Sequence, residues 1–221
     1  MRERTSAVSY DLDGVIFQRV PFQFAAFLPS WMRKSILKPK HAPITIDERE
    51  TQFRRLSIAE KVELEFHNIR HVKPEATKMV NQTQADLKIG NTGRPNHEQM
   101  VRVTKRHLFE SDIGHEFANV AFKPKGVSSD ESKYWTLIEL QRTGYTDIVH
   151  YDDNALTVKR LAKLLPQVRF IIVQDLTSGI LFSKSEMKKY PNVARIALHK
   201  NGEIETTFMP EGFGELPHLR K

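Results

Sequence analysis

Acidic side chains occur in two short groups, and each group comes directly after a stretch that is predicted to be a β-strand. Asp11 and Asp13 follow the stretch 7–10, and Asp152 and Asp153 follow a second such stretch. The carboxyl ends of parallel strands converge on the ligand crevice of an open sheet, so these carboxylates are expected to meet there. Carboxylates that are buried together need a cation or a proton to neutralise them. A metal site and an acid–base pair are the two chemical interpretations, and solvated acids or helix N-caps are the structural ones.

A second group, Thr92, Gly93 and Arg94, lies in a predicted turn after a strand over 85–90. It combines a hydroxyl, exposed backbone amides and a guanidinium group, which together suit a phosphate. An ordinary glycine-containing turn with a surface arginine is the alternative.

Lys133 lies near the start of a predicted helix, where a cation opposes the helix dipole unless an anion is close by. A solvated lysine is the alternative, and Lys123 and Lys125 compete for the same role.

The elements that would position these residues alternate between strand and helix. Predicted strands cover residues 7–10, 85–90, 117–122, 147–151 and 168–173. Predicted helices cover 57–70, a segment from Pro74, 96–109, a segment from Ser128 to Gly144, and 156–165. This alternation predicts an α/β fold with a doubly wound parallel sheet. Near the end, Asn201-Gly202 predicts a β-hairpin with a type I′ turn, within residues 192–210.

The composition sets further limits. The 221 residues contain no cysteine, which excludes disulfides, thiolate catalysis and cysteine-ligated zinc. The formal net charge of +7 favours anionic partners: phosphorylated metabolites, nucleic acid or an acidic membrane surface. No signal peptide and no membrane-spanning stretch are recognised, so the chain is expected to be cytoplasmic, and membrane contact is the least favoured of the three. The oligomeric state is not predicted.

Together, these groups resemble the four ordered motifs of the haloacid dehalogenase superfamily, over residues 7 to about 175. The motifs are Asp11-Leu12-Asp13-Gly14-Val15, then Thr92, then Lys133, then Asp152-Asp153. The resemblance implies a Rossmann-like core and a phosphohydrolase, in which Asp11 attacks phosphorus and carries the phosphoryl group. Asp13 would protonate the leaving oxygen and then deprotonate the attacking water. Thr92 and Lys133 would hold the phosphoryl oxygens.

The resemblance also implies a Mg²⁺ cofactor. Its ligands would be the Asp11 carboxylate, the Asp13 backbone carbonyl and Asp152 or Asp153. Oxygen ligands suit Mg²⁺, and phosphoryl transfer needs mainly positioning and charge neutralisation. The function implied is that of a Mg²⁺-dependent phosphomonoesterase acting on a phosphorylated substrate.

A narrower resemblance is to the 3′-phosphatase domain of polynucleotide kinases. It depends on the Thr92-Gly93-Arg94 turn and on the stretch 133–161. It implies that Gly93 and Arg94 contact the substrate phosphate and that nucleic-acid 3′ ends are substrates. A small-metabolite phosphatase and a non-catalytic module that binds nucleic acid or acidic lipid are the alternatives.

The first two motifs are about eighty residues apart, longer than a simple connection requires. The family places a cap domain in this interval, so residues 18–72 are predicted to form a mainly helical cap on a core of 1–17 and 73–221. Aromatic and basic residues interleave there: Phe22, Phe24, Phe27, Trp31, Arg33, Lys34, Lys38, Lys40 and His41. They could bind nucleic acid or a membrane, and a solvated face packed on the core is the alternative.

Overall fold

The computed structural model describes residues 5–18, 61, 63–65, 67, 70–174 and 182–217. The predicted cap over 18–72 and the predicted helix over 57–70 lie largely outside these residues, as do the aromatic and basic residues named for the cap. The division into core and cap therefore stays a prediction.

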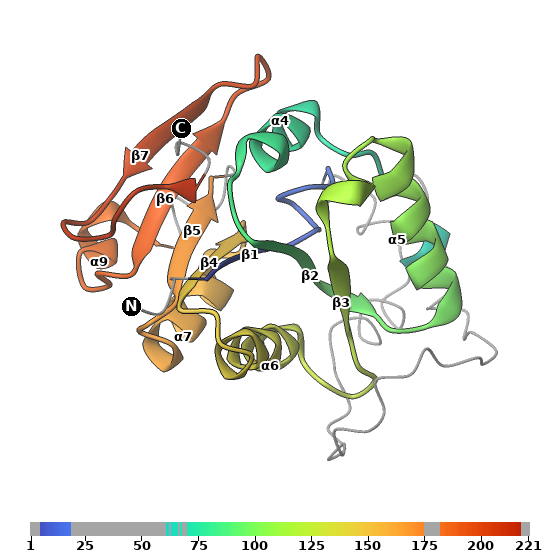
Figure 1. Ribbon diagram of the computed structural model, residues 1–221, viewed down its shortest axis with the longest axis horizontal. Coiled ribbons are helices and arrows are strands. Elements are labelled where there is room, and N and C mark those ends of the chain that lie inside the picture. Colours follow the sequence, from blue (N-terminus) through green and yellow to red (C-terminus); the bar gives the residue numbers. More distant parts are fainter. Residues whose placement is uncertain are drawn as a thin grey trace, which may run out of the picture.

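The core of the fold is a seven-stranded sheet with the order β3-β2-β1-β4-β5-β6-β7 (Figure 1). The strands are β1 (Ser6–Tyr10), β2 (Leu87–Pro95), β3 (Asn119–Lys123), β4 (Asp147–Asp152), β5 (Arg169–Val173), β6 (Val193–Leu198) and β7 (Ile204–Phe208). All neighbours pair in parallel except β6 and β7, which are antiparallel. The predicted α/β fold with a mostly parallel sheet is confirmed.

Helices cover both faces of this sheet (Figure 1). They are α4 (Pro74–Gln82), α5 (Glu98–Glu110), α6 (Ser129–Arg142), α7 (Ala155–Leu164) and the short α9 (Lys184–Met187), with a 3₁₀ turn at Gly114–Glu116. Side chains alternate along each strand, so Val8 and Tyr10 of β1 pack in the apolar layer with α4 and α5. Ala7 packs in the opposite layer with α6, α7 and α9. The sheet is therefore doubly wound, as predicted.

The path of the chain reverses direction at the centre of the sheet. From β1 the chain moves outward to β2 and β3, then returns to place β4 on the other side of β1. Open α/β sheets bind ligands at such a switch point, beyond the carboxyl ends of the strands. Asp11 and Asp152 lie at this point, because Tyr10 of β1 is paired with Tyr151 of β4.

Two local predictions were wrong. Residues 91–95 are not a free turn, because β2 continues to Pro95 through a shift of register between Asn91 and Pro95. The hairpin at Asn201-Gly202 forms, but its turn is not type I′, since only Gly202 has a positive φ, of 79°. The amide of Gly202 donates to the carbonyl of His199 at 2.8 Å, which is the pattern of a type I turn followed by a left-handed glycine.

The ends of helix α6 lie where the sequence predicts them. Ser128 accepts a hydrogen bond from the amide of Glu131 at 3.2 Å and caps α6, and Gly144, with φ of 101°, follows its end. None of the helices in the described part of the chain has both the length and the apolar character needed to cross a bilayer.

Candidate functional site

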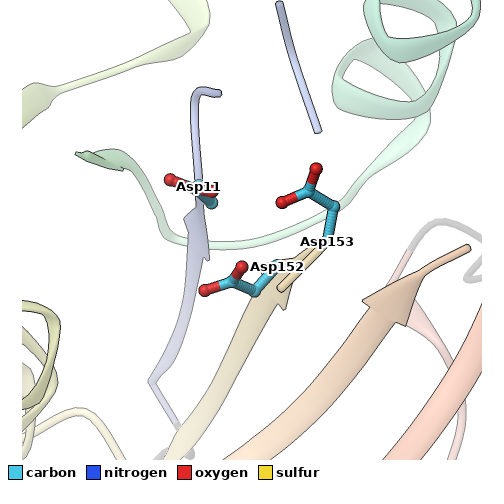
Figure 2. A group of neighbouring side chains, drawn as sticks. All are labelled: Asp11, Asp152 and Asp153. Atoms are coloured by element: carbon cyan, nitrogen blue, oxygen red, sulfur yellow. The ribbon is translucent and has the colours of Figure 1, made fainter. Parts of the chain in front are cut away.

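Three carboxylates meet at the carboxyl ends of β1 and β4 (Figure 2). One carboxylate oxygen each from Asp11, Asp152 and Asp153 lies within 4.8 Å of the others. All three residues are buried, with exposures of 5%, 0% and 3%. The backbone keeps them together, because the amide of Asp11 donates to the carbonyl of Tyr151 at 2.8 Å. Asp11 of the first acidic group and both residues of the second group therefore share one site.

Lys133, from the second turn of α6, supplies the positive charge at this site. Its Nζ donates to Oδ2 of Asp152 at 2.7 Å and lies 3.1 Å from Oδ1 of Asp11. Lys125 is exposed and Lys123 lies at the end of β3. Lys133 is thus the lysine that the fold brings to the carboxylates.

The site holds more negative than positive charge. Burial raises the pKa of Asp11 well above its ordinary value, and Asp152 and Asp153 add to this although Lys133 opposes it. Burial would also raise the pKa of Asp152, but Lys133 and His150 outweigh it and hold that pKa low. Burial would lower the pKa of Lys133, but Asp11 and Asp152 raise it, so the ammonium group stays charged.

Three carboxylates and one ammonium group leave two negative charges when all are ionised. A divalent cation would neutralise them, and three carboxylate oxygens are the donors that Mg²⁺ prefers. Asp11, Asp152 and Asp153 therefore fit a magnesium ion, by their chemistry and by their charge.

His150 belongs to the same site, and sequence reasoning missed it. It is fully buried in β4, with Nδ1 3.0 Å from the hydroxyl of Ser9 and Nε2 3.3 Å from Oδ2 of Asp152. Burial lowers the pKa of His150, which favours the neutral ring. The available signal was spacing, since residues two apart in a strand point to the same face and His150 is two before Asp152.

The carboxylate of Asp153 packs directly against Gly14. Its φ is 90°, and a Cβ built at this position would lie 1.6 Å from Oδ2 of Asp153. The carboxylate thus occupies the space that any other side chain would fill. Lys73 also donates to the Gly14 carbonyl and ties the loop to the segment before α4.

Helix capping does not explain the acidic pair. Asn154 caps α7, accepting hydrogen bonds from the amides of Leu156 and Thr157 at 3.1 and 3.3 Å. Oδ1 of Asp152 accepts from the amide of Asn154 at 2.8 Å, which fixes the carboxylate rather than capping the helix.

Asp13 lies in a separate, cationic environment. Its carboxylate accepts hydrogen bonds from Nε and Nη2 of Arg94, the latter at 2.8 Å, and from Arg70. The hydroxyl of Thr92 lies 3.3 Å from its Oδ2, and Nδ1 of His67 lies 3.7 Å from its Oδ1. The metal role predicted for Asp13 belonged to its backbone carbonyl, and it stays a prediction.

Arg94 is held rigidly in this arrangement. Its side chain is fully buried, Nη1 donates to the hydroxyl of Thr104 at 2.8 Å, and the guanidinium carbon lies 4.2 Å from the centre of the Phe17 ring. Arg94 therefore contacts Asp13 directly, and the predicted contact with a substrate phosphate stays a prediction. Gly93 beside it lets α6 approach, because a Cβ there would lie 2.6 Å from Oγ of Ser129.

These cations keep Asp13 ionised. Burial alone would raise the pKa of Asp13, but the charge and hydrogen bonds of Arg94, with the charge of Arg70, hold it below its ordinary range. Burial lowers the pKa of His67 to about 3, so this imidazole is neutral. Arg70 and His67 carry no motif, and sequence reasoning did not single out either as a site residue.

Comparison with known proteins gives no sequence match and a similar solved structure. No family model matches the chain, and no curated protein matches it. A solved structure of a hydrolase of the haloacid dehalogenase-like family from Streptococcus pneumoniae is similar, with a TM-score of 0.49 and 11% sequence identity, over 90% of this chain and 96% of that one. None of these three comparisons supports the narrower resemblance to polynucleotide 3′-phosphatases.

Proposed function

We propose that the protein is a magnesium-dependent phosphomonoesterase with Asp11 as its nucleophile. The observation that carries the proposal is a buried group at the switch point of the sheet, in which Lys133 contacts Asp11 and Asp152 and the carboxylate of Asp153 lies beside theirs. Such a group combines a nucleophile, a fixed cation and a site for a divalent ion. Phosphoryl transfer requires these features more than any covalent chemistry of the protein.

Asp13 is ionised in the free protein, so it must take up a proton as the anionic substrate binds. In the first step, an oxygen of Asp11 attacks phosphorus as the bond to the leaving oxygen breaks, and Asp13 gives that proton to the leaving oxygen. In the second step, Asp13 takes a proton from water, whose oxygen attacks phosphorus, and the bond to Asp11 breaks. Each proton that Asp13 gives is thus recovered, and Asp11 returns as a free carboxylate. The contact between Lys133 and Asp11 supports this role, because the ammonium group keeps the nucleophile close to an anionic substrate.

Asp11, Asp152 and Asp153 would hold the magnesium ion, which would neutralise charge on the transferred phosphoryl group. Thr92 and Lys133 would contact that group, as the four motifs imply, and Gly93 would contact it as the narrower resemblance implies. Thr92 would have to turn its hydroxyl from Asp13, and a threonine side chain reaches a second rotamer at low cost.

The test is release of phosphate from 4-nitrophenyl phosphate, with and without Mg²⁺, by wild type and Asp11→Asn. Wild type should turn over only with Mg²⁺, and the variant should lose at least a thousandfold of the activity. Arg102→Gln on the exposed face of α5 serves as the matched control and should keep full activity. Undiminished turnover by Asp11→Asn would exclude this nucleophile.

The physiological ester is a second question. Nucleic-acid 3′ ends and small phosphorylated metabolites are both proposed substrates, and rates on a 3′-phosphorylated oligonucleotide and on nucleotides and sugar phosphates separate them. Salt should weaken the oligonucleotide reaction strongly if a basic surface holds the strand. No contact among the described residues favours a non-catalytic module.

A further inference from the structure

The environment of Asp13 contains an excess of positive charge. Two guanidinium groups, those of Arg70 and Arg94, contact this one carboxylate. The described ion pairs of Arg169 and Arg160 each join one arginine to one aspartate instead. A second cation on a paired, partly buried carboxylate is costly unless another anion joins them at some stage.

Arg70 is built into the fold at this place. The segment that carries it runs beside the loop after β1, where the amide of Gln18 donates to the carbonyl of His71 at 3.0 Å and the amide of Lys73 donates to that of Ile16 at 2.9 Å. Its side chain is 18% exposed, and its Nε is buried without a hydrogen-bond partner among the described residues. One donor of a fixed guanidinium is therefore unused.

The two arginines also lie on a defined side of the site. A general acid must come within hydrogen-bond reach of the leaving oxygen, about 2.6–3.2 Å. In the proposed reaction, the groups that contact Asp13 would therefore lie beside the leaving group, and Lys133 and the other carboxylates would lie beside the transferred phosphoryl group. The Asp13 side chain is 25% exposed, so solvent reaches this carboxylate.

We infer that Arg70 and Arg94 form a subsite for a second anionic group, a carboxylate or a phosphate, on the leaving group of the substrate. This inference rests on the proposed function, since it places the leaving group beside Asp13. Arg70 is the specificity-determining member, because its guanidinium keeps an unused donor, while Arg94 is fixed by Thr104 and Phe17. Arginine suits the task, because its planar fork binds carboxylate and phosphate oxygens in pairs.

Two matched pairs of esters test the subsite. 2-Phosphoglycerate has a carboxylate beside the ester where glycerol 2-phosphate has a neutral hydroxymethyl group. A nucleoside 3′,5′-bisphosphate differs from the 3′-monophosphate by a phosphate farther from the ester. Wild type should prefer the more anionic member of at least one pair in kcat/KM. Arg70→Gln should reduce that preference by roughly tenfold to a hundredfold, the effect of losing a charge-assisted hydrogen bond.

Arg70→Lys and Arg102→Gln are the companion variants. The lysine variant keeps the charge without the fork and should keep part of the preference, and Arg102→Gln should keep all of it. Equal rates of wild type on both members of both pairs would overturn the subsite. An equal fall of kcat on both members in Arg70→Gln would also overturn it, because Arg70 would then only position Asp13.

Binding separates this inference from the proposed function. Asp11→Asn should bind 2-phosphoglycerate or the bisphosphate more tightly than its matched partner in calorimetry, and adding Arg70→Gln should remove the difference. Failure of wild type to hydrolyse any ester, together with selective binding, would reject the phosphatase and retain the subsite. Hydrolysis of the esters without selective binding would retain the phosphatase and reject the subsite.

Discussion

Asp11, Asp152 and Asp153 are three buried carboxylates that lie close together, and two of them, Asp11 and Asp152, contact the ammonium group of Lys133. Like charges in a buried site destabilise the folded state unless a cation or proton joins them. Burial first, and then the neighbouring carboxylates, raise the pKa of Asp11, and the raised pKa expresses this cost. Natural active sites often keep such unfavourable charge because the reaction needs it.

Asp11→Asn is therefore expected to be more stable than wild type at neutral pH in metal-free buffer. The folded pKa of Asp11 lies above its unfolded value, so the stability it contributes is present at low pH and is lost as pH rises through the folded pKa. The advantage of the variant should accordingly grow from acid to neutral pH. Thermal unfolding in EDTA measures it, with roughly 2–4 °C for each 1 kcal/mol in a chain of this size.

Glu110→Gln on the exposed end of α5 is the control, and it should show no such pH-dependent gain. An Asp11→Asn protein that is less stable than wild type at neutral pH would contradict the expectation.

Replacement of Gly14 should destabilise the fold, because any side chain at this position would collide with the carboxylate of Asp153. Gly14→Ala should destabilise the fold by about 1–2 kcal/mol for the positive φ, and by about 1–3 kcal/mol more for displacing Asp153. Gly144→Ala isolates the first contribution, since φ is also positive there and nothing lies within 4 Å of the added carbon. Urea unfolding of both variants gives the difference, and equal losses would show that Asp153 adapts freely.

At the scale of elements, strand β4 joins the site to the interior of the sheet. The ionised carboxylate of Asp152 can accept hydrogen bonds but cannot donate them. Nε2 of His150 therefore carries the proton and donates to Oδ2 of Asp152, and Nδ1 accepts from the hydroxyl of Ser9. Strands β1 and β4 thus fix the orientation of a proposed metal ligand through one buried imidazole. Partners of this kind tune the affinity of metal sites.

His150→Phe keeps a ring of similar size but removes the donor to Asp152. We expect Mg²⁺ affinity to fall about tenfold to a hundredfold, as found when such partners are lost. Calorimetric titration with Mg²⁺ measures it. Asn154→Ala is the matched control on the same segment: it should cost about 1 kcal/mol of stability by uncapping α7 and leave the affinity unchanged. Unchanged affinity in His150→Phe would assign the histidine to packing alone.

At the scale of the whole molecule, binding of a cation at the switch point should stabilise the entire fold, because the site joins strands from both halves of the sheet. Mg²⁺ at a hundred times its Kd should add about 2.7 kcal/mol, or roughly 5–10 °C in Tm. Asp152→Asn/Asp153→Asn should abolish the shift. Sodium chloride at matched ionic strength controls for screening of the +7 net charge, and an equal shift with that salt would argue against a specific site.

Much of this architecture could be predicted from local sequence. Strand and helix alternation predicts the sheet, and capping residues such as Ser128 mark helix ends, because both depend on nearby residues. Asp11 and Asp152 could be brought together in advance, since the topology of a parallel sheet determines where its strands end. Helix α9 has only four residues and gave no periodic signal.

The surroundings of Asp13 could not be predicted, because they depend on contacts between distant segments. Arg94 looked like a free anion-binding group in a turn, whereas the extension of β2 aims it at Asp13. Arg70 comes from a connection with no motif of its own, and His150 was hidden in an apolar strand. These pairings follow from tertiary packing, which a single sequence does not specify residue by residue.

The central position of β1 has a consequence for synthesis. Ala7 pairs with Leu87 on one side and with Ile148 on the other, so the strand leaves the ribosome long before either partner exists. Long-range parallel pairing of this kind is slow to form and leaves an apolar segment uncovered meanwhile. A nascent chain shorter than about 153 residues lacks Asp153 and cannot complete the acidic group. Chaperones that bind the unpaired strand β1 should therefore be released only after β4 has emerged from the ribosome.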